Sequence, residues 1–237
     1  MAQPGESGGL SMPSRVAGTQ SRSSKVQIAR LLLPFGWVLA TIGYYGPWIA
    51  HRTAALTLTG SDMGEFVKFL PGVLDGSLQA TRQLFYLPPV AVVLSVALLV
   101  GNRILGYSPL LSVAAIALAV VVSVQLLPPA WSPASLVTSE FRLQLITLGI
   151  CWLALVSFWL LGRLPVRLTA LACCGLAVAA GVLSAWQLLS VKPAISTTYG
   201  IAPAVGWGYW SCLAGLAMVT AGAVALALSP ANHSRKL

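Results

Sequence analysis

Apolar residues in this chain are gathered into six long blocks, separated by short segments that hold most of the charged and turn-forming residues. A helix needs about 20 apolar residues to cross the hydrocarbon core of a bilayer. The predicted spans cover residues 28–50, 84–101, 109–127, 143–162, 168–191 and 207–228. The pattern therefore predicts an all-α fold, a polytopic transmembrane helix bundle of six spans within residues 28–229.

The second block favours a helix least, because Pro88 and Pro89 lie near its start. Proline lacks the backbone N–H that a helix interior needs, so we expect this helix to be kinked or to begin late. If the block did not cross the membrane, every later span would be inverted.

The two ends of the chain are expected to be tails. Residues 1–27 are rich in Gly, Ser, Pro and Gln, include several basic residues and have few apolar ones, which predicts a disordered basic tail. The apolar block 28–50 is too long for the hydrophobic region of a cleaved signal peptide, so we expect it to remain as the first span. Residues 230–237 form a second, short tail.

The composition agrees with a membrane protein. Of the 237 residues, 57% are hydrophobic and 8% are charged, whereas soluble domains carry about 25% charged residues. So few charges could not cover a water-facing surface, so the first predicted partner is the lipid bilayer. The net charge of +9 does not come from a basic, aromatic-rich soluble module, and no nucleic-acid partner is expected.

The distribution of Lys and Arg orients the bundle, because cytoplasmic loops are enriched in these residues. Nine of the 14 lie on the side of both termini and five on the opposite side. The sequence therefore predicts a multi-pass protein of the cell membrane, plasma or inner, with both termini cytoplasmic. The five outer basic residues are Arg52, Lys68, Arg82, Arg142 and Lys192, and the outer acidic residues are Asp62, Glu65, Asp75 and Glu140.

The longest outer loop, residues 51–83, contains a short amphipathic pattern. With Ser61 or Asp62 as the N-cap, four apolar residues recur at helical spacing on one face until Pro71. They are Met63, Phe66, Val67 and Leu70. Such a helix lies on the membrane or caps the bundle, or it binds a partner or gates a substrate. A second helix is expected to begin at Ser77 and to continue into the second span.

The segment 199–210 mixes Gly and Pro with aromatic residues directly before the last span. Trp207, Tyr209 and Trp210 fit an aromatic belt at the outer interface, or a docking surface. Together with the apolar face of the loop helix, they form the predicted outer-face surface for a partner or for gating.

Residues with catalytic or ligating chemistry are few. His51 is a weak candidate for holding a cofactor, because the only other histidine, His233, lies in the opposite tail. The four cysteines, Cys151, Cys173, Cys174 and Cys212, lie inside apolar blocks without the spacing of a metal site. No ionisable residue lies at the middle of a span, which disfavours ion-coupled transport. We predict no catalytic residue, no metal and no cofactor.

Two other features of the predicted spans are their small residues and their glutamines. Two sets at four-residue spacing would permit close helix contact, within the chain or between subunits of a homo-oligomer. These sets are Ala177, Gly181 and Ala185, and Ala217, Ala221 and Ala225. Near the outer ends of their spans, Gln125, Gln144 and Gln187 either form one polar cluster or bond separately to headgroups and neighbouring helices.

Three functions fit this pattern. The first is a non-catalytic accessory or scaffold subunit of a membrane complex, in contact with other membrane subunits. The second is the transmembrane component of a transporter for a neutral or lipid-like solute. The third is a lipid or quinone enzyme at the outer interface, using His51 with Asp62 or Glu65. The sequence favours the first and does not favour an enzyme.

The predicted topology can be tested with reporter fusions along the chain. Fusions after Ser108 and Pro165 should report the cytoplasm, and fusions after Gly60 and Ser132 the exterior, because basic inner loops are retained. A reporter placed near Gly101 that gave the exterior signal would show that the second block does not cross.

Overall fold

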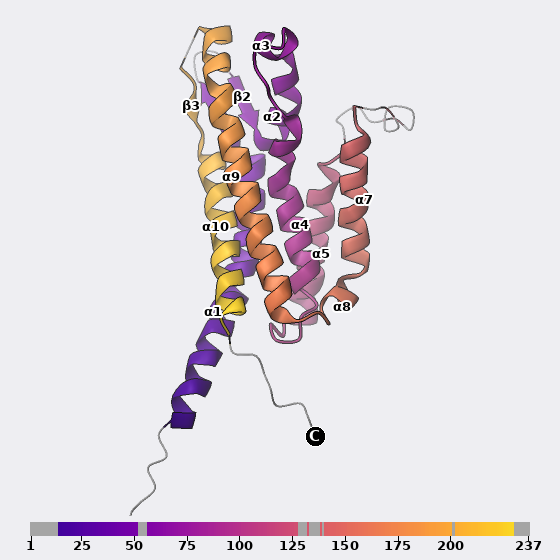
Figure 1. Ribbon diagram of the computed structural model, residues 1–237, viewed down its shortest axis with the longest axis vertical. Coiled ribbons are helices and arrows are strands. Elements are labelled where there is room, and N and C mark those ends of the chain that lie inside the picture. Colours follow the sequence, from indigo (N-terminus) through magenta and orange to yellow (C-terminus); the bar gives the residue numbers. More distant parts are fainter. Residues whose placement is uncertain are drawn as a thin grey trace, which may run out of the picture.

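The computed structural model describes residues 14–51, 56–127, 132, 138, 140–200 and 202–229. Helices make up most of this part of the chain and run side by side along its long axis (Figure 1). The predicted helix bundle is thereby confirmed in its class. A small sheet, which an all-α fold does not include, closes one end.

The long helices are α1 (Ser14–Tyr45), α4 (Leu87–Leu99), α5 (Pro109–Val124), α7 (Arg142–Val156), α9 (Val166–Tyr199) and α10 (Trp207–Ala227). The short ones are α2 (Gly60–Phe66), α3 (Pro71–Leu74) and α8 (Phe158–Leu161), with the 3-10 turns η1 (Val67–Phe69) and η2 (Arg82–Tyr86). The strands are β1 (Pro47–His51), β2 (Leu56–Thr59) and β3 (Ala204–Val205). We call the end with the strands, α2 and α3 the cap end, and the end where α1 starts and α10 stops the terminus end (Figure 1).

Four segments are long and apolar enough to cross a membrane, which indicates a membrane protein. They are Ser24–Tyr45, Arg82–Leu99, Val166–Tyr199 and Trp207–Ala227. These correspond to the first, second, fifth and sixth predicted spans. The third and fourth predicted spans contain α5 and α7, which are apolar but shorter.

Several helix boundaries differ from those predicted. Helix α1 begins at Ser14, before the expected start at 28, and ends at Tyr45 rather than 50. Gly46 and Pro47 follow, and proline cannot supply the N–H that would continue the helix. Helix α9 runs past the expected end at 191, includes Pro193 and stops at Tyr199. Its C-cap is Gly200 at φ 63°, the left-handed conformation in which glycine commonly ends helices.

The sheet joins two strands that follow α1 to one strand that precedes α10. Its strand order is β2-β1-β3, and both pairings are antiparallel. Ile49 of β1 stands opposite Leu58 of β2 on one side and Val205 of β3 on the other. The sheet therefore binds the end of α1 to the start of α10, and it is built from residues that the sequence assigned to a helix and to loops.

The two prolines of the second span occupy a position that tolerates them. Pro88 and Pro89 lie in the first turn of α4, where backbone N–H groups have no partner within the helix. The helix expected from Ser77 onwards does not form. Instead, the Ser77 N–H donates to the carboxylate of Asp75 at 2.8 Å, and helical structure resumes only at η2.

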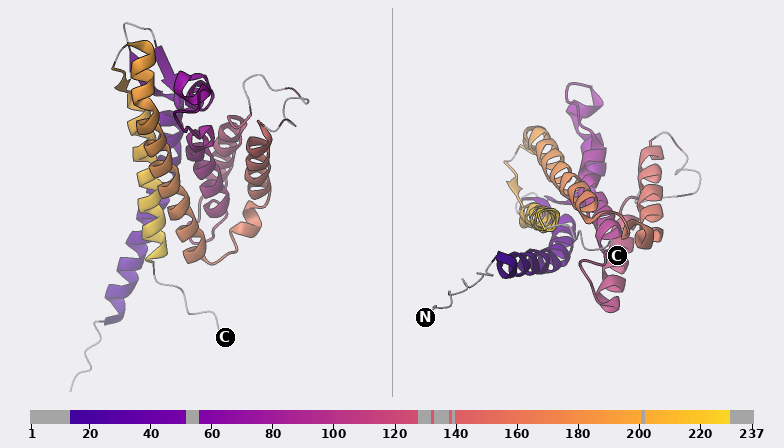
Figure 2. Two further views of the ribbon diagram at one scale, coloured as in Figure 1. Left: turned by 45° about the horizontal axis from the view of Figure 1, so that its top comes forward. Right: turned by 60° about the horizontal axis from the view of Figure 1, so that its bottom comes forward.

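The closest helix contact is between α10 and the C-terminal part of α1, and the first turns of α1 extend beyond the end of α10 (Figure 2). A Cβ added to Gly43 would overlap the backbone nitrogen of Cys212, and one added to Gly215 would overlap that of Ala40. The predicted small-residue set of the last helix is not used here, because Ala217 and Ala221 are exposed. The glycine face that makes this contact was not predicted from the sequence.

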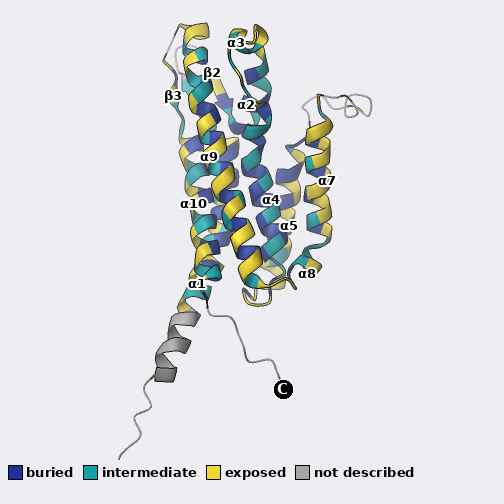
Figure 3. Ribbon diagram, in the orientation of Figure 1, coloured by how far each residue is buried: buried dark blue, intermediate teal, exposed yellow. Residues whose placement is uncertain are grey.

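The other helices are arranged around α4. Helix α9 contacts both α10 and α4, while α5 and α7 pack against α4 and each other. Buried residues lie along α4 and the inward faces of its neighbours, whereas α7 is largely exposed (Figure 3). At the cap end, the Trp48 ring packs against the rings of Phe85 and Tyr209, with centroid distances of 6.2 and 5.5 Å. Residues of β1, η2 and α10 therefore share one aromatic core.

The glycine contact leads to a stability prediction. Gly43→Ala should lower the stability of the detergent-solubilised protein by about 1–3 kcal/mol, because the added methyl forces two backbones apart. Gly175→Ala is the matched control, since a Cβ there would meet nothing within 4 Å. Thermal unfolding followed by tryptophan fluorescence measures both, and equal midpoints for the two variants would contradict the argument.

Candidate functional site

Charged residues from four separate segments meet at the cap end. Arg82 lies at the centre of this group and is 9% exposed. Its Nη1 lies 2.8 Å from Oε1 of Glu140 and 3.7 Å from Oε1 of Glu65. Its Nη2 donates to the Oε1 of Gln144 and, at 3.3 Å, to the backbone carbonyl of Glu140. The guanidinium thereby links η2, α2 and the start of α7.

A second cation closes the network. The Nζ of Lys68 lies 2.7 Å from Oε2 of Glu65 and 3.1 Å from Oε1 of Glu140, so the two carboxylates are each shared by two cations. The ring of Phe141 lies 4.9 Å from the Arg82 guanidinium carbon and 5.9 Å from Lys68 Nζ. Two positive and two negative groups form this set, which we call the cap ion network, and its net charge is zero.

Local structure fixes where the network residues point. Thr59 is the N-cap of α2: its hydroxyl accepts from the Asp62 N–H, while the Asp62 carboxylate accepts from the Thr59 N–H. This capping box fixes the start of α2. One turn later Glu65 faces Arg82, and the Tyr86 hydroxyl donates to Glu65 at 3.1 Å. The sequence predicted the N-cap as Ser61 or Asp62, which lie two and three residues after Thr59.

Electrostatics in the network follow from its short contacts. The hydrogen bond to Glu65 raises the pKa of Lys68 above its usual value; burial opposes this rise, and the hydrogen bond to Glu140 adds to it. Hydrogen bonding to Lys68, helped by the charge of Arg82, lowers the pKa of Glu140. Both shifts favour the charged forms of Lys68 and Glu140, so the pKa changes agree with the ion pair between them.

Cavities flank the network. One cavity, of about 560 Å³, is lined by Asp62 and Glu65 and by further residues of β2, α2, η1, η2 and the end of α5. A smaller cavity of about 150 Å³ lies between η2, α4, the end of α5 and α7, and its polar lining residues are Gln83, Tyr86, Gln144 and Thr147. The Gln144 side chain thus lies between this cavity and Arg82.

The three amides do not form one cluster. Gln144 accepts from Arg82, whereas the Gln187 Oε1 accepts from the Thr81 N–H at 3.2 Å. Gln125 lines the large cavity instead. The alternative of separate bonds to neighbouring segments therefore describes Gln144 and Gln187.

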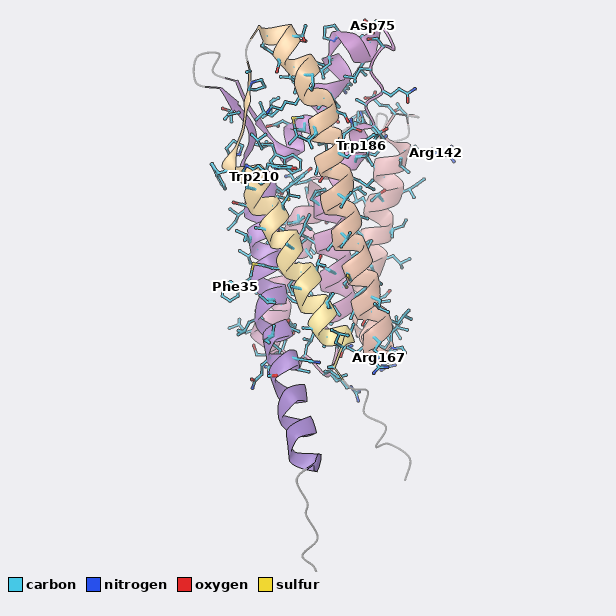
Figure 4. The ribbon with its side chains drawn as sticks, turned by 60° about the vertical axis from the view of Figure 1, so that its left-hand side comes forward. Phe35, Asp75, Arg142, Arg167, Trp186 and Trp210 are labelled. Atoms are coloured by element: carbon cyan, nitrogen blue, oxygen red, sulfur yellow. The ribbon has the colours of Figure 1, made fainter. Side chains whose placement is uncertain are left out.

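The predicted partner surface is divided between the interior and the exterior. Met63, Val67 and Leu70 are buried in the chain's own core, and Tyr209 is 5% exposed. Phe66 is half-buried and stacks on Tyr199, with ring centroids 6.2 Å apart. Trp207 and Trp210 remain outside, at 57% and 60% exposed. Figure 4 shows Trp210 at the periphery of the bundle.

The remaining candidates are placed as follows. His51 is the last residue of β1, and its side chain lies outside the described part of the structure, as does His233. The four cysteines lie in α7, α9 and α10, and three of them are buried. Among the described residues, no group of three or more His, Cys, Asp or Glu side chains is placed to hold a metal ion.

Comparison with known protein families, curated proteins and solved structures found no match for this chain.

The cap ion network was not predicted from the sequence. The only signal was that Glu65, Lys68, Arg82 and Glu140 all fall in predicted outer segments with opposite charges. Residues 65 and 140 are far apart in sequence, and nothing in the local pattern pairs them.

The network predicts a specific loss of stability. Arg82→Met should destabilise the protein by about 1–3 kcal/mol, because it leaves two carboxylates and the Gln144 oxygen without their shared donor. Arg142→Met is the matched control: it removes one positive charge at the same end, from an exposed side chain with no ion pair in the described structure. The thermal midpoint in detergent measures both, and the prediction fails if the two midpoints fall equally.

Proposed function

We propose that this chain is a six-span protein of the cell membrane, with both termini cytoplasmic, that serves as a non-catalytic accessory or scaffold subunit of a membrane complex. The observation that carries the proposal is that all four described carboxylates form structural hydrogen bonds or ion pairs within the cap. Glu65 and Glu140 are ion-paired, Asp62 caps α2, and Asp75 accepts from Ser77. Each holds the cap in shape, which is the role of a rigid scaffold.

The charge of the two ends supports the orientation. Arg30, Arg103, Arg163 and Arg167 lie towards the terminus end, and every described acidic residue lies at the cap end. Figure 4 shows this separation through Arg167 and Asp75, which mark opposite ends. Positive charge without acidic partners is typical of the cytoplasmic side. In this orientation the cap faces outward.

Six spans require α5 and α7 to cross as well. Their 16 and 15 residues give lengths of about 24 and 22 Å at 1.5 Å per residue, against a hydrocarbon thickness of about 30 Å. Apolar residues continue each helix, through Leu127 after α5 and through α8 after α7. The remaining mismatch favours local thinning of the bilayer or association with other helices, and the exposed α7 suits such association.

The cap offers a second surface for a partner. Phe69 and Leu74 are 66% and 73% exposed, and α3 lies at the tip of the molecule (Figure 1). Helix α9 reaches the same end and is 34 residues long, about 51 Å, so this tip extends beyond a 30 Å core. Large apolar side chains exposed to water favour burial by another protein. We assign the partner surface to these residues, together with Trp207 and Trp210.

A transport component for a neutral or lipid-like solute is the second candidate. It is favoured by the cavity of about 150 Å³ beside α4 and α7, whose lining combines apolar residues such as Leu87 and Leu143 with Gln144. The third function, an enzyme at the outer interface, relied on Asp62 or Glu65 beside His51. Both carboxylates have structural partners, which weakens that hypothesis.

The scaffold function predicts a complex that depends on the tip of the cap. After gentle extraction, the tagged chain should elute with one or more other membrane proteins in fixed stoichiometry. Leu74→Asp should release them, because it places a charge in an apolar interface. Gln79→Asp is the matched control, since Gln79 is an exposed polar residue of the same segment.

Two results would contradict the proposal. One is a wild-type chain that elutes alone under conditions that preserve other membrane complexes. The other is reconstituted vesicles in which the purified chain alone moves a neutral solute, which would favour the transport component instead.

A further inference from the structure

An apolar groove with a basic end lies between α1 and α5 near the terminus end. Two cavities, of about 400 and 320 Å³, share Arg30, Leu31 and Leu111 in their walls. Gln27 and Tyr107 complete the first cavity. The second continues along α1 past Pro34, Phe35 and Val38. The groove thus changes from polar to apolar over a short distance.

Arg30 is held in place at the polar end. Its Nη2 donates to the backbone carbonyl of Gly106 at 2.9 Å, which fixes the guanidinium against the turn before α5. A guanidinium has five N–H donors, so one hydrogen bond leaves most of them for a ligand. The described carboxylates all lie at the cap end, so Arg30 has no acidic partner within the described chain. The positive charge here is uncompensated.

The apolar part of the groove faces the surroundings of the bundle. Leu31, Phe35 and Val38 are 62%, 64% and 46% exposed and follow one face of α1. Phe35 projects from the bundle in Figure 4. The eight helical steps from Arg30 to Val38 cover about 12 Å, less than half of a hydrocarbon core of about 30 Å. An occupant of the groove therefore lies within one leaflet, and hydrocarbon is the material it meets there.

We propose that this groove binds one anionic phospholipid, with the phosphate on Arg30 and one acyl chain along Leu31, Phe35 and Val38. Arginine binds phosphate oxygens in a bidentate way, and basic pockets between helices on the cytoplasmic side are suited to anionic headgroups. Gln27 adds an amide donor beside the phosphate. A zwitterionic lipid fits the apolar part equally well but brings a positive group to a site that has no acid.

This site is independent of the proposed scaffold function. It requires that α1 lies in a bilayer, and it holds equally for a subunit of a complex or a transport component. Failure of the partner experiment would leave the lipid site untouched, and the converse is also true.

Native mass spectrometry of the purified full chain tests the site. The protein is mixed with equal amounts of phosphatidylglycerol and phosphatidylcholine of the same acyl chains, and the first lipid bound is identified. Wild type should bind phosphatidylglycerol preferentially. Arg30→Gln should weaken that binding about tenfold, the loss expected for a charge-assisted hydrogen bond, and should remove the preference. Free glycerol phosphate should not compete, because it lacks the acyl chain.

Two further variants separate the site from general charge and from misfolding. Arg167→Gln removes an exposed arginine at the same end, from the first turn of α9, and should keep the preference. Leu111→Trp keeps Arg30 but fills both cavities, and should abolish specific binding. The proposal is overturned if wild type shows no headgroup preference, if Arg30→Gln and Arg167→Gln lose it equally, or if Leu111→Trp binds as wild type does.

Discussion

Backbone contact between α1 and α10 is the constraint on which the rest of the structure depends. Glycine at 43 and at 215 lets the two helices approach until backbone meets backbone, a distance that no side chain permits. In a bilayer, where lipid is as apolar as leucine, helix association relies on such close van der Waals packing. The first and last long helices of the chain are therefore bound to each other before any loop contact is considered.

The cap follows from that contact. The end of α1 lies beside the start of α10, so the segments next to them can pair. Strand β1 pairs with β3, with Ile49 opposite Val205. The Gly206 N–H also donates to the Trp48 carbonyl at 2.8 Å. Strand β2 then adds to the free edge of β1, and Thr59 at its end caps α2. Glu65 on α2 is thereby brought to Arg82, and the ion network fastens the cap to α4 and α7.

The sequence predicted the features that depend on composition and local periodicity. Helices in all six blocks, the amphipathic turn around Met63 and the late start of α4 at Pro88 and Pro89 are of this kind. What it missed depends on distant neighbours. Residues 47–51 are apolar enough for a helix, and only pairing with β2 and β3 makes them a strand. Likewise, Met63 and Val67 were expected either to cap the bundle or to face a partner, because periodicity identifies an apolar face without showing what covers it; both are buried in the chain's own core.

The two ends of the bundle differ in whether their basic side chains are paired with acidic ones. At the cap end, Lys68 and Arg82 are paired with Glu65 and Glu140, and the exposed side chains at the tip include the apolar Phe69 and Leu74. A surface of that kind selects partners by shape and buried area. At the terminus end Arg30 has no acidic partner within the described chain and lies beside an apolar groove, which fits the anionic phospholipid proposed above. The proposed protein association at one end and the proposed lipid site at the other both rest on one asymmetry, the confinement of the described acidic residues to the cap.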